Sequence, residues 1–398
     1  MTSPFGGLAR DVRIPDPGRV SRALRAPDQG PRILFFSGGT ALKRISQALV
    51  AYTHNSVHLV TPFDSGGSSA VLRRHFDMPA VGDLRSRLMA LADRTRDGFP
   101  AISDLFAYRL PKDSDPAELR AELAALAAGS HHLTANVLNP MRGSILRHLR
   151  IFIDEAGPDF DLRGACMGNL VLAAGYLEND RRMAPIVSRY ADLVQARGEV
   201  RLIVEASLQL RAELAGGEAV VGQHLLTGKE CPPLTRSVEN LALVDPGKEN
   251  SSVRPPIQAE IRDAIHGANL ICYPVGSFYS SLVANLLPAG VGAAVGHAAC
   301  PKIFVPNTLR DPEAVGLSLG GQVGALLRHL RADDPGTIAA ADVLDAVLLD
   351  PDVRYPGSAE PERELAALGV RVIKTPLTAR ATRAVDPHLL CRALVSLA

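Results

Sequence analysis

The sequence predicts an α/β protein built on a Rossmann-like, doubly wound and mostly parallel sheet. Apolar runs at 32–36 and 56–61 flank a helical pattern at 42–49, which indicates a strand, a helix and a second strand. Such a unit pairs its strands in parallel. Later strand-like runs alternate with helical patterns at 257–266 and 320–331, as in doubly wound folds. These runs lie at 201–206, 219–225, 241–244, 269–273, 302–305, 346–349 and 370–373.

The predicted organisation is a single α/β domain over 32–398 with a helical insertion at about 83–160. Leucines at helical spacing, broken by glycine and proline, predict the insertion. Residues 1–31 are rich in proline and glycine, with charges spread among them, and we expect a mobile or loosely packed N-terminal arm. The arm has no apolar core of the kind found in a signal peptide.

Composition excludes several classes of function. The chain has 398 residues, with 43 basic and 42 acidic side chains, so it lacks the basic footprint of a nucleic-acid-binding protein. The segment 267–301 has no charged residue, but Pro274, Pro288 and several glycines interrupt it, and we expect no membrane span. Five cysteines without a CxxC pair indicate a reduced, cytoplasmic protein.

The first candidate site is the turn Ser37-Gly38-Gly39-Thr40. It follows the first predicted strand and precedes a helix, where backbone N–H groups can receive a phosphate. Gly38 and Gly39 would let the backbone approach the anion closely. The alternative interpretation is an ordinary tight turn between strand and helix.

A second turn, from Asp64 to Ser69, follows the next strand and would face the same edge of the sheet. Asp64 offers a carboxylate for Mg²⁺ or a substrate hydroxyl, and Gly67, Ser68 and Ser69 offer amide and hydroxyl donors for phosphate. The alternative is an Asx-turn that caps a helix.

Asp83 and Arg85 come soon after this turn and could bring a carboxylate and a guanidinium to the same crevice. That combination suits a diphosphate. The alternative is a helix cap and a surface arginine.

Three later segments repeat this pattern of polar residues beside predicted strands or helices. Asn169 opens an apolar helix, Gly276 and Ser277 follow the uncharged strand, and Asn307 ends the strand that starts at 302. Turns of this kind on several strands favour a shared ligand crevice. The pair His131-His132 lacks the partners of a metal motif.

Taken in order, six motifs resemble the CofD-like, 2-phospho-L-lactate transferase family, which includes the YvcK-type gluconeogenesis factors. They are SGGTALKRISQAL, VTPFDSGGSSAVLR, GDLRSRLMALAD, GNLVLAAGYL, GSFYSSLVANLL and PKIFVPN. The resemblance implies a homodimer whose crevice holds a nucleotide-linked small molecule. Transferase members move a phosphoacyl group from a guanosine-activated donor to a deazaflavin alcohol with Mg²⁺, whereas regulator members bind UDP-sugars.

The resemblance implies a transferase here, with a regulator as the alternative. Asp64, Asp83 and Arg85 would be catalytic, and Asp64 would hold Mg²⁺. The nucleotide would be bound by Gly38, Gly39, Thr40, Gly67, Ser68, Ser69, Asn169, Gly276, Ser277 and Asn307. Ser65 stands where the family often carries a second aspartate, and this change favours the regulator. A third interpretation is a subunit of a larger assembly whose pocket has decayed.

Overall fold

The central element is a seven-stranded sheet whose neighbouring strands all run parallel. The computed structural model describes residues 14–95, 99–228, 231–249, 251–379 and 382–398. The strand order is β11-β10-β9-β8-β1-β2-β3. The strands are β1 Ile33–Ser37, β2 Val57–Val60, β3 Glu199–Leu202, β8 Leu270–Tyr273, β9 Lys302–Phe304, β10 Ala346–Leu349 and β11 Arg371–Lys374. The predicted doubly wound α/β fold is confirmed.

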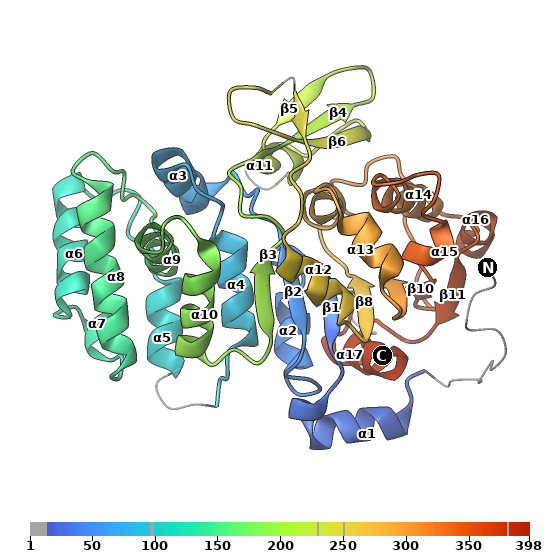
Figure 1. The fold of residues 1–398 in the computed structure, drawn as a ribbon, viewed down its shortest axis with the longest axis horizontal. Helices are drawn as coiled ribbons and strands as arrows, with labels where there is room; N and C mark the ends of the chain where they lie inside the picture. The colour runs from blue at the N-terminus through green and yellow to red at the C-terminus, as the bar shows by residue number, and fades with distance from the viewer. Residues whose placement is uncertain (1–13, 96–98, 229–230, 250, 380–381) are drawn as a thin grey trace.

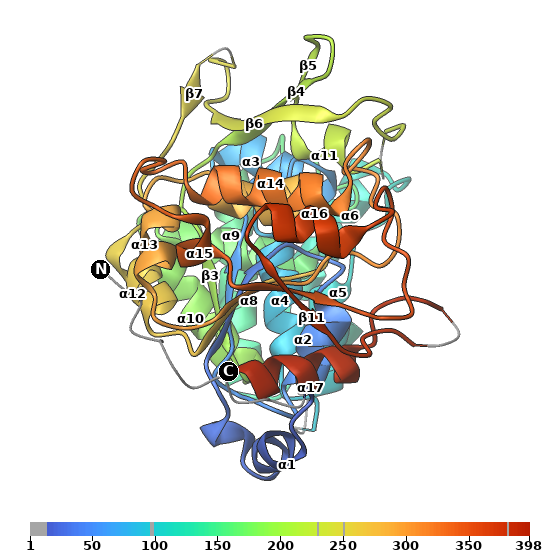
Figure 2. The ribbon, with the colours of Figure 1, turned by 90° about the vertical axis from the view of Figure 1, so that its right-hand side faces the viewer.

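Helices cover both faces of this sheet, which explains why β1 is buried along its whole length. Side chains alternate between the faces of a strand. Ile33 and Phe35 pack with α2 (Lys43–Leu49) and α17 (Pro387–Leu397). Leu34 and Phe36 lie in the core of the other face. The helices of that core are α12 Ala259–His266, α13 Val291–His297, α14 Leu319–Leu330, α15 Ala340–Val343 and α16 Pro361–Ala367 (Figure 2).

The strand order reverses at the border between β1 and β8. From β1 the chain proceeds through β2 to β3 on one side, and from β8 it proceeds through β9 and β10 to β11 on the other. In open α/β sheets such a reversal leaves a crevice at the carboxyl ends of the two strands. The topology therefore places a cavity beside the turns that follow β1 and β8.

A run of helices separates β2 from β3 and forms the left-hand part of Figure 1. It has an apolar core of its own that includes Leu88, Leu123 and Leu149. The run extends beyond the expected limits of 83–160 and ends only at Val194. Its helices are α3 Gly67–Phe76, α4 Gly82–Leu91, α5 Phe99–Ala107, α6 Pro116–Ala128, α7 His132–Ala135, α8 Met141–Ala156, α9 Met167–Glu178 and α10 Met183–Val194.

A separate four-stranded antiparallel sheet lies at the top of both views (Figures 1 and 2). Its order is β5-β4-β6-β7, with β4 Gln209–Leu214, β5 Ala219–Val221, β6 Val238–Val244 and β7 Ser252–Val253. The short helix α11, Gln223–Leu226, replaces the second half of the strand expected at 219–225. Sequence patterns did not predict this second sheet, and β4 was missed. Leu210 and Leu214 of β4 are buried in a core shared with the parallel sheet.

The part of the N-terminal segment that the structure describes is folded, in contrast to the loosely packed arm expected there. Asp16 caps α1 (Pro17–Arg25) by accepting the N–H groups of Gly18 and Arg19. Val20 and Ala23 are buried in the core that contains α17. A 3₁₀ turn, η1 (Pro27–Gln29), leads from α1 into β1. Residues 1–13 lie outside the described residues.

The uncharged segment 267–301 folds as β8, two short helical turns and α13. The turns are η2, a π-helical turn at Phe278–Leu282, and η3, a 3₁₀ turn at Val283–Leu286. Among the residues that the structure describes, no helix combines the length and apolar character needed to cross a bilayer.

Candidate functional site

A crevice of about 460 Å³ opens at the carboxyl ends of β1, β2 and β8. The turn after each of these strands contributes to its wall, as the reversal of strand order predicts. Residues of α4 and α11 complete it. The lining residues are Gly38, Gly39, Thr40, Ala41, Leu42, Asp64, Gly66, Asp83, Gln223, His224, Thr227, Val275, Gly276, Ser277, Ser280 and Ser281.

A buried arginine of α4 holds the turn after β1. Nη2 of Arg87 donates to the carbonyl oxygens of Gly38, at 2.5 Å, and Gly39, at 3.0 Å. Nη1 donates to Ser46 Oγ at 2.6 Å. Burial lowers the pKa of Arg87 to about 10, and the nearby Asp83 carboxylate opposes that shift. Arg87 therefore carries its charge at neutral pH directly behind the glycine turn.

This contact orients the amide groups of the turn. In a planar trans peptide the N–H points opposite to the carbonyl of the same unit. The N–H groups of Gly39 and Thr40 therefore point away from Arg87. Neither N–H has an acceptor within the described part of the chain, and both residues line the crevice. The turn thus offers two backbone donors to an anion.

The two glycines are needed for contacts inside the protein as well as for any ligand. A Cβ on Gly38 would overlap the side chain of Ser281, and one on Gly39 would overlap a carboxylate oxygen of Asp83. Asn285, fully buried, joins the same two turns through bonds from Nδ2 to the carbonyls of Ser37, at 3.1 Å, and Ser281, at 2.8 Å. The turns after β1 and β8 are therefore packed as one unit.

The turn after β2 presents Asp64 to the crevice. Its Oδ1 accepts the N–H of Gly66 at 3.0 Å, which is the Asx-turn given as the alternative interpretation. Arg73, itself buried, donates to the carbonyls of Asp64, at 3.0 Å, and Leu208, at 2.5 Å, and so ties this turn to the segment leading into β4. The Asx-turn uses one carboxylate oxygen and leaves Oδ2 for other contacts.

Asp64 and Asp83 bring two carboxylates to the same crevice. Mg²⁺ is commonly held by one or two carboxylates, with waters and substrate phosphates completing its shell. These two residues fit that donor set. Within the described residues no group of three or more metal-binding side chains occurs, so a bound Mg²⁺ would need ligand or water oxygens as well.

Ser68 and Asn169 lie behind the crevice wall and contact each other. Nδ2 of Asn169 donates to Ser68 Oγ at 3.0 Å, and both side chains are nearly inaccessible to solvent. The Asn169 Oδ1 is buried without a hydrogen-bond partner among the described residues. Ser69 lies at the base of the wall, where a Cβ on Gly82 would come within 2.6 Å of its Oγ.

Arg85 occupies a different environment from Asp83. Its Nη1 donates to the carbonyl of Phe106 at 2.9 Å, and its Cδ would lie 2.6 Å from a Cβ on Gly168. The side chain packs between α5 and α9 and is absent from the lining of the described crevice. Arg85 therefore packs between helices, whereas Arg87 contacts the glycine turn.

Carboxylates occupy the helix N-terminus after β8. Asp311 accepts the N–H of Phe278 at 2.8 Å, and Glu313 accepts those of Tyr279, at 3.0 Å, and Ser280, at 2.7 Å. These amides are therefore not available to a phosphate. Asn307 holds the preceding turn by donating to the carbonyl of Gly276 at 2.6 Å and accepting its N–H at 3.0 Å. Asn307 thus braces Gly276 and Ser277 from outside the crevice.

We expect Glu313 to make folding stability depend on pH. Burial is the main cause that raises its pKa to about 7 from an ordinary value of 4.5. An acid with a raised pKa stabilises the fold fully below its unfolded pKa, and that contribution is lost as pH rises through the folded pKa. We expect the free energy of unfolding to fall between about pH 4.5 and 7 by a larger amount in the parent than in Glu313→Gln. Urea unfolding at several pH values measures this, and equal slopes would show that Glu313 is not the cause.

His224 on α11 contributes the imidazole of the crevice. Its Nδ1 lies 2.8 Å from Ser65 Oγ, and its backbone N–H donates to the same oxygen at 3.2 Å. Thr227, one turn later, donates from Oγ1 to the His224 carbonyl at 3.3 Å. Sequence patterns did not identify His224, because its partner Ser65 lies 159 residues away.

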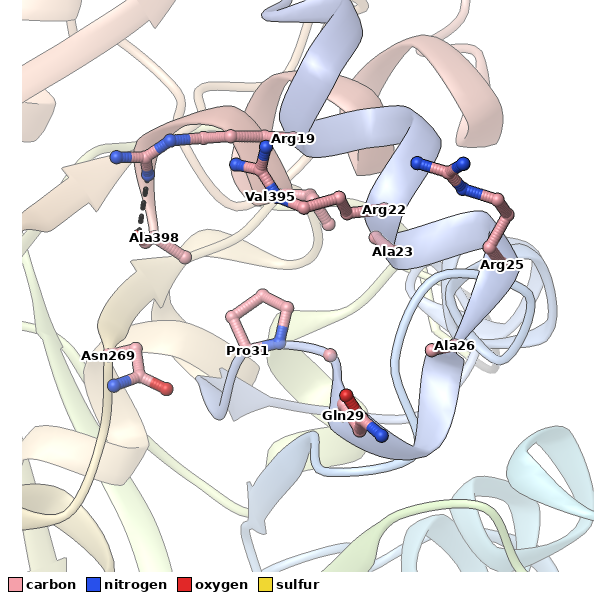
Figure 3. Close-up of a pocket in the computed structure, with 11 residues that line it drawn as sticks. Arg19, Arg22, Ala23, Arg25, Ala26, Gln29, Pro31, Asn269, Val395 and Ala398 are labelled. Atoms are coloured by element: carbon pink, nitrogen blue, oxygen red, sulfur yellow. Dashed lines mark hydrogen bonds between the residues drawn. The ribbon is translucent and has the colours of Figure 1, made fainter.

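A second hollow, of about 570 Å³, lies at the opposite edge of the sheet (Figure 3). Arg19 and Arg22 of α1 lie above it, across from Pro31 and Asn269. Arg19 donates from Nη1 to the carbonyl of Ala398 at 2.8 Å. Pro31 and Asn269 precede β1 and β8, so this hollow is at the amino ends of the strands, whereas α/β sheets bind ligands at the carboxyl ends.

Comparison with known proteins places this architecture in a family. The model of the 2-phospho-L-lactate transferase CofD family matches residues 33–378. The chain belongs to the CofD family. The matched range includes every residue that lines the crevice, so the resemblance inferred from the six motifs is confirmed.

Curated relatives of this CofD-family chain bear the name gluconeogenesis factor. The protein of that name from Bacillus subtilis is 27% identical over 379 residues, which cover 93% of this chain and 98% of the relative. A putative gluconeogenesis factor from Nostoc is 26% identical, over 83% of this chain and 57% of that longer protein. A crystal structure of a UPF0052 family member from Bacillus halodurans shares the fold, with a TM-score of 0.65, 21% identity, and coverage of 92% of this chain and 99% of that one.

The CofD-family crevice brings together some of the residues predicted from the sequence and leaves others outside. Gly38, Gly39, Thr40, Asp64, Asp83, Gly276 and Ser277 line it. Gly67, Ser68, Ser69, Asn169 and Asn307 belong to the surrounding shell, and Arg85 packs elsewhere. Arg87 was missed although it stands in the same GDLRSRL motif, where its spacing to Asp83 by one helical turn was the available signal.

Proposed function

We propose that this CofD-family protein binds the diphosphate of a nucleotide-linked ligand in the crevice and acts as a ligand-binding regulator, with a UDP-sugar as the ligand class. One observation carries the proposal. The backbone donors of Gly39 and Thr40 face a cavity at the reversal of strand order, where α/β proteins bind nucleotides. The volume of about 460 Å³ suits a small molecule.

The turn after β2 favours regulation over catalysis. Ser65, which stands where the family often has a second aspartate, is engaged with His224. Binding needs only complementarity to the ground-state ligand, whereas catalysis needs groups that act on the transition state. The name of the curated relatives, gluconeogenesis factor, agrees with a regulator.

A panel of nucleotides tests the proposal. We expect UDP-sugars to raise the thermal unfolding midpoint, because ligand at 100 times its dissociation constant adds about 2.7 kcal/mol to the unfolding free energy. GDP, UDP and deazaflavins, each with and without Mg²⁺, are the comparison ligands. A panel in which no nucleotide shifts the midpoint would contradict the proposal.

A transferase is the second candidate, and the presence of both Asp64 and Asp83 in the crevice favours it. When bound, Mg²⁺ would neutralise charge on a leaving phosphate. Asp64 and Asp83 would hold the ion, and the Gly39 and Thr40 amides would orient the diphosphate.

Turnover distinguishes the two candidates. The protein would be incubated with Mg²⁺, a guanosine-diphospho-lactate donor and a deazaflavin, and release of the mononucleotide measured. As a regulator it should release none. Release that falls by more than about tenfold, or 1.4 kcal/mol, in Asp64→Asn and in Asp83→Asn would instead establish the transferase. Asp104→Asn, an exposed aspartate of α5, is the matched control.

The family also implies a homodimer, which light scattering would detect.

A further inference from the structure

The contact between Ser65 and His224 joins the two sheets of the protein at the crevice. Ser65 belongs to the turn after β2, and His224 belongs to α11 between two strands of the antiparallel sheet. Two hydrogen bonds connect them, one from the His224 backbone N–H and one through Nδ1. The backbone and the ring of His224 are both held by the same hydroxyl group.

The chain leaves room for this ring at Gly222. Gly222 has a φ of +114°, a conformation that side chains rarely adopt. A Cβ there would lie 2.9 Å from His224 Cε1, 3.0 Å from Nδ1 and 3.3 Å from Ser65 Oγ. Because Gly222 has no side chain, the His224 ring and Ser65 Oγ can both lie close to its Cα. Gly222 and Ser65 together therefore fix the position of the imidazole.

The hydrogen bonds indicate which ring nitrogen is left for a ligand. Ser65 Oγ already accepts the His224 backbone N–H, and its own proton can be donated to Nδ1. A neutral imidazole that accepts at Nδ1 carries its proton on Nε2. Nε2 has no hydrogen-bond partner within the described ranges, and the residue lines the crevice.

The charges of the crevice show why such a donor matters. Its lining contains two carboxylates, Asp64 and Asp83, and within the described ranges it contains no lysine or arginine. Arg87 is fully buried behind the glycine turn and cannot contact a ligand directly. The backbone amides of Gly39 and Thr40 are two donors for an anionic ligand, and His224 places an imidazole in the same lining.

We propose that His224 binds an anionic phosphate group of the ligand through Nε2, and that Ser65 is the positioning residue that fixes the ring. This inference rests on the proposed function and assigns the phosphate-binding side chain of the same site. The ring is a neutral donor, so its contact with the phosphate does not itself require Mg²⁺. It also makes α11 and the antiparallel sheet a part of the binding site.

Calorimetric titration with UDP-glucose in the absence of Mg²⁺ tests the assignment. We expect His224→Gln to weaken binding about tenfold or more, because hydrogen bonds to charged groups are among the stronger ones. Ser65→Ala should weaken binding by a smaller factor. Ser65→Thr, which keeps the hydroxyl, should bind with the affinity of the parent. His266→Gln, an exposed histidine of α12, is the matched control and should bind as the parent does.

The possible results separate the two levels of the proposal. Binding by the parent with unchanged affinity in His224→Gln would overturn the role of His224 and leave the proposed function standing. Binding of no nucleotide by the parent would overturn both.

Nitrogen NMR of the histidine ring gives an independent readout that does not depend on the stability of the variant. We expect the free parent to carry the His224 proton on Nε2, and the Nε2 signal to shift when UDP-glucose is added. Ser65→Ala should change the tautomer without unfolding the protein. An Nδ1-protonated ring, or a ring signal that does not respond to ligand in a parent that binds it, would overturn the assignment.

Discussion

Arg87→Met should weaken nucleotide binding strongly and destabilise the fold, and this is the largest effect that we expect. The substitution removes donors to the carbonyls of Gly38 and Gly39 and to Ser46 Oγ, all within 3.0 Å. A buried acceptor left without its partner costs about 1–3 kcal/mol. We therefore expect a loss of roughly 2–4 kcal/mol of unfolding free energy. Because the same bonds orient the Gly39 and Thr40 amides, affinity should fall about 100-fold, or 2.7 kcal/mol.

Arg85→Met is the matched control for this prediction. It lies two residues earlier in α4, and its described hydrogen bond goes to Phe106 rather than to the glycine turn. Denaturant unfolding and titration of both variants distinguish the two arginines. Parental affinity in the Arg87→Met variant would refute the orienting role. If that variant does not fold, Arg87→Lys keeps the charge with fewer donors and should show a weaker form of the same loss.

Gly38→Ala should be the second most damaging change in the crevice. The new Cβ would overlap Oγ and Cβ of Ser281, at the place where the turns after β1 and β8 pack together. Overpacking of this kind costs about 1–3 kcal/mol, and the two turns would have to separate. We expect affinity for the nucleotide to fall at least about tenfold, since the amides of the first turn would move with it.

Removing the Ser281 side chain tests this explanation directly. Ser281→Gly in the Gly38→Ala background should recover most of the lost stability, because the clash is with the Ser281 side chain. Gly143→Ala is the control, since a Cβ there meets nothing within 4 Å and alanine suits a helix better than glycine. Thermal unfolding of the parent and of these variants measures the effect. Failure of the double variant to recover would show that backbone conformation, and not this contact, requires glycine at 38.

The sequence by itself determined the elements of the parallel sheet and the turns that follow them. The apolar runs predicted β1, β2, β8, β9 and β10 to within a few residues, because a strand buried on both faces has a continuous apolar pattern. The edge strand β11, which is only partly buried, was also predicted to within a few residues. Parallel pairing of these strands places the glycine turns that follow them at one edge of the sheet. Asp64, Asp83 and Gly276 could therefore be assigned to the crevice in advance.

Only the tertiary structure decided which polar groups are available in that crevice. Arg85 and Arg87 are equally basic in the sequence, and the direction of each side chain from α4 separates packing from support of the glycine turn. The amides after β8 resemble a phosphate site until Asp311 and Glu313, some 33 residues away, are seen to occupy them. Likewise, Ser65 and His224 become a pair only when the antiparallel sheet places α11 beside the turn after β2. Such contacts join residues far apart in the chain, so no local pattern records them; the fold creates them when it brings the ends of the strands together.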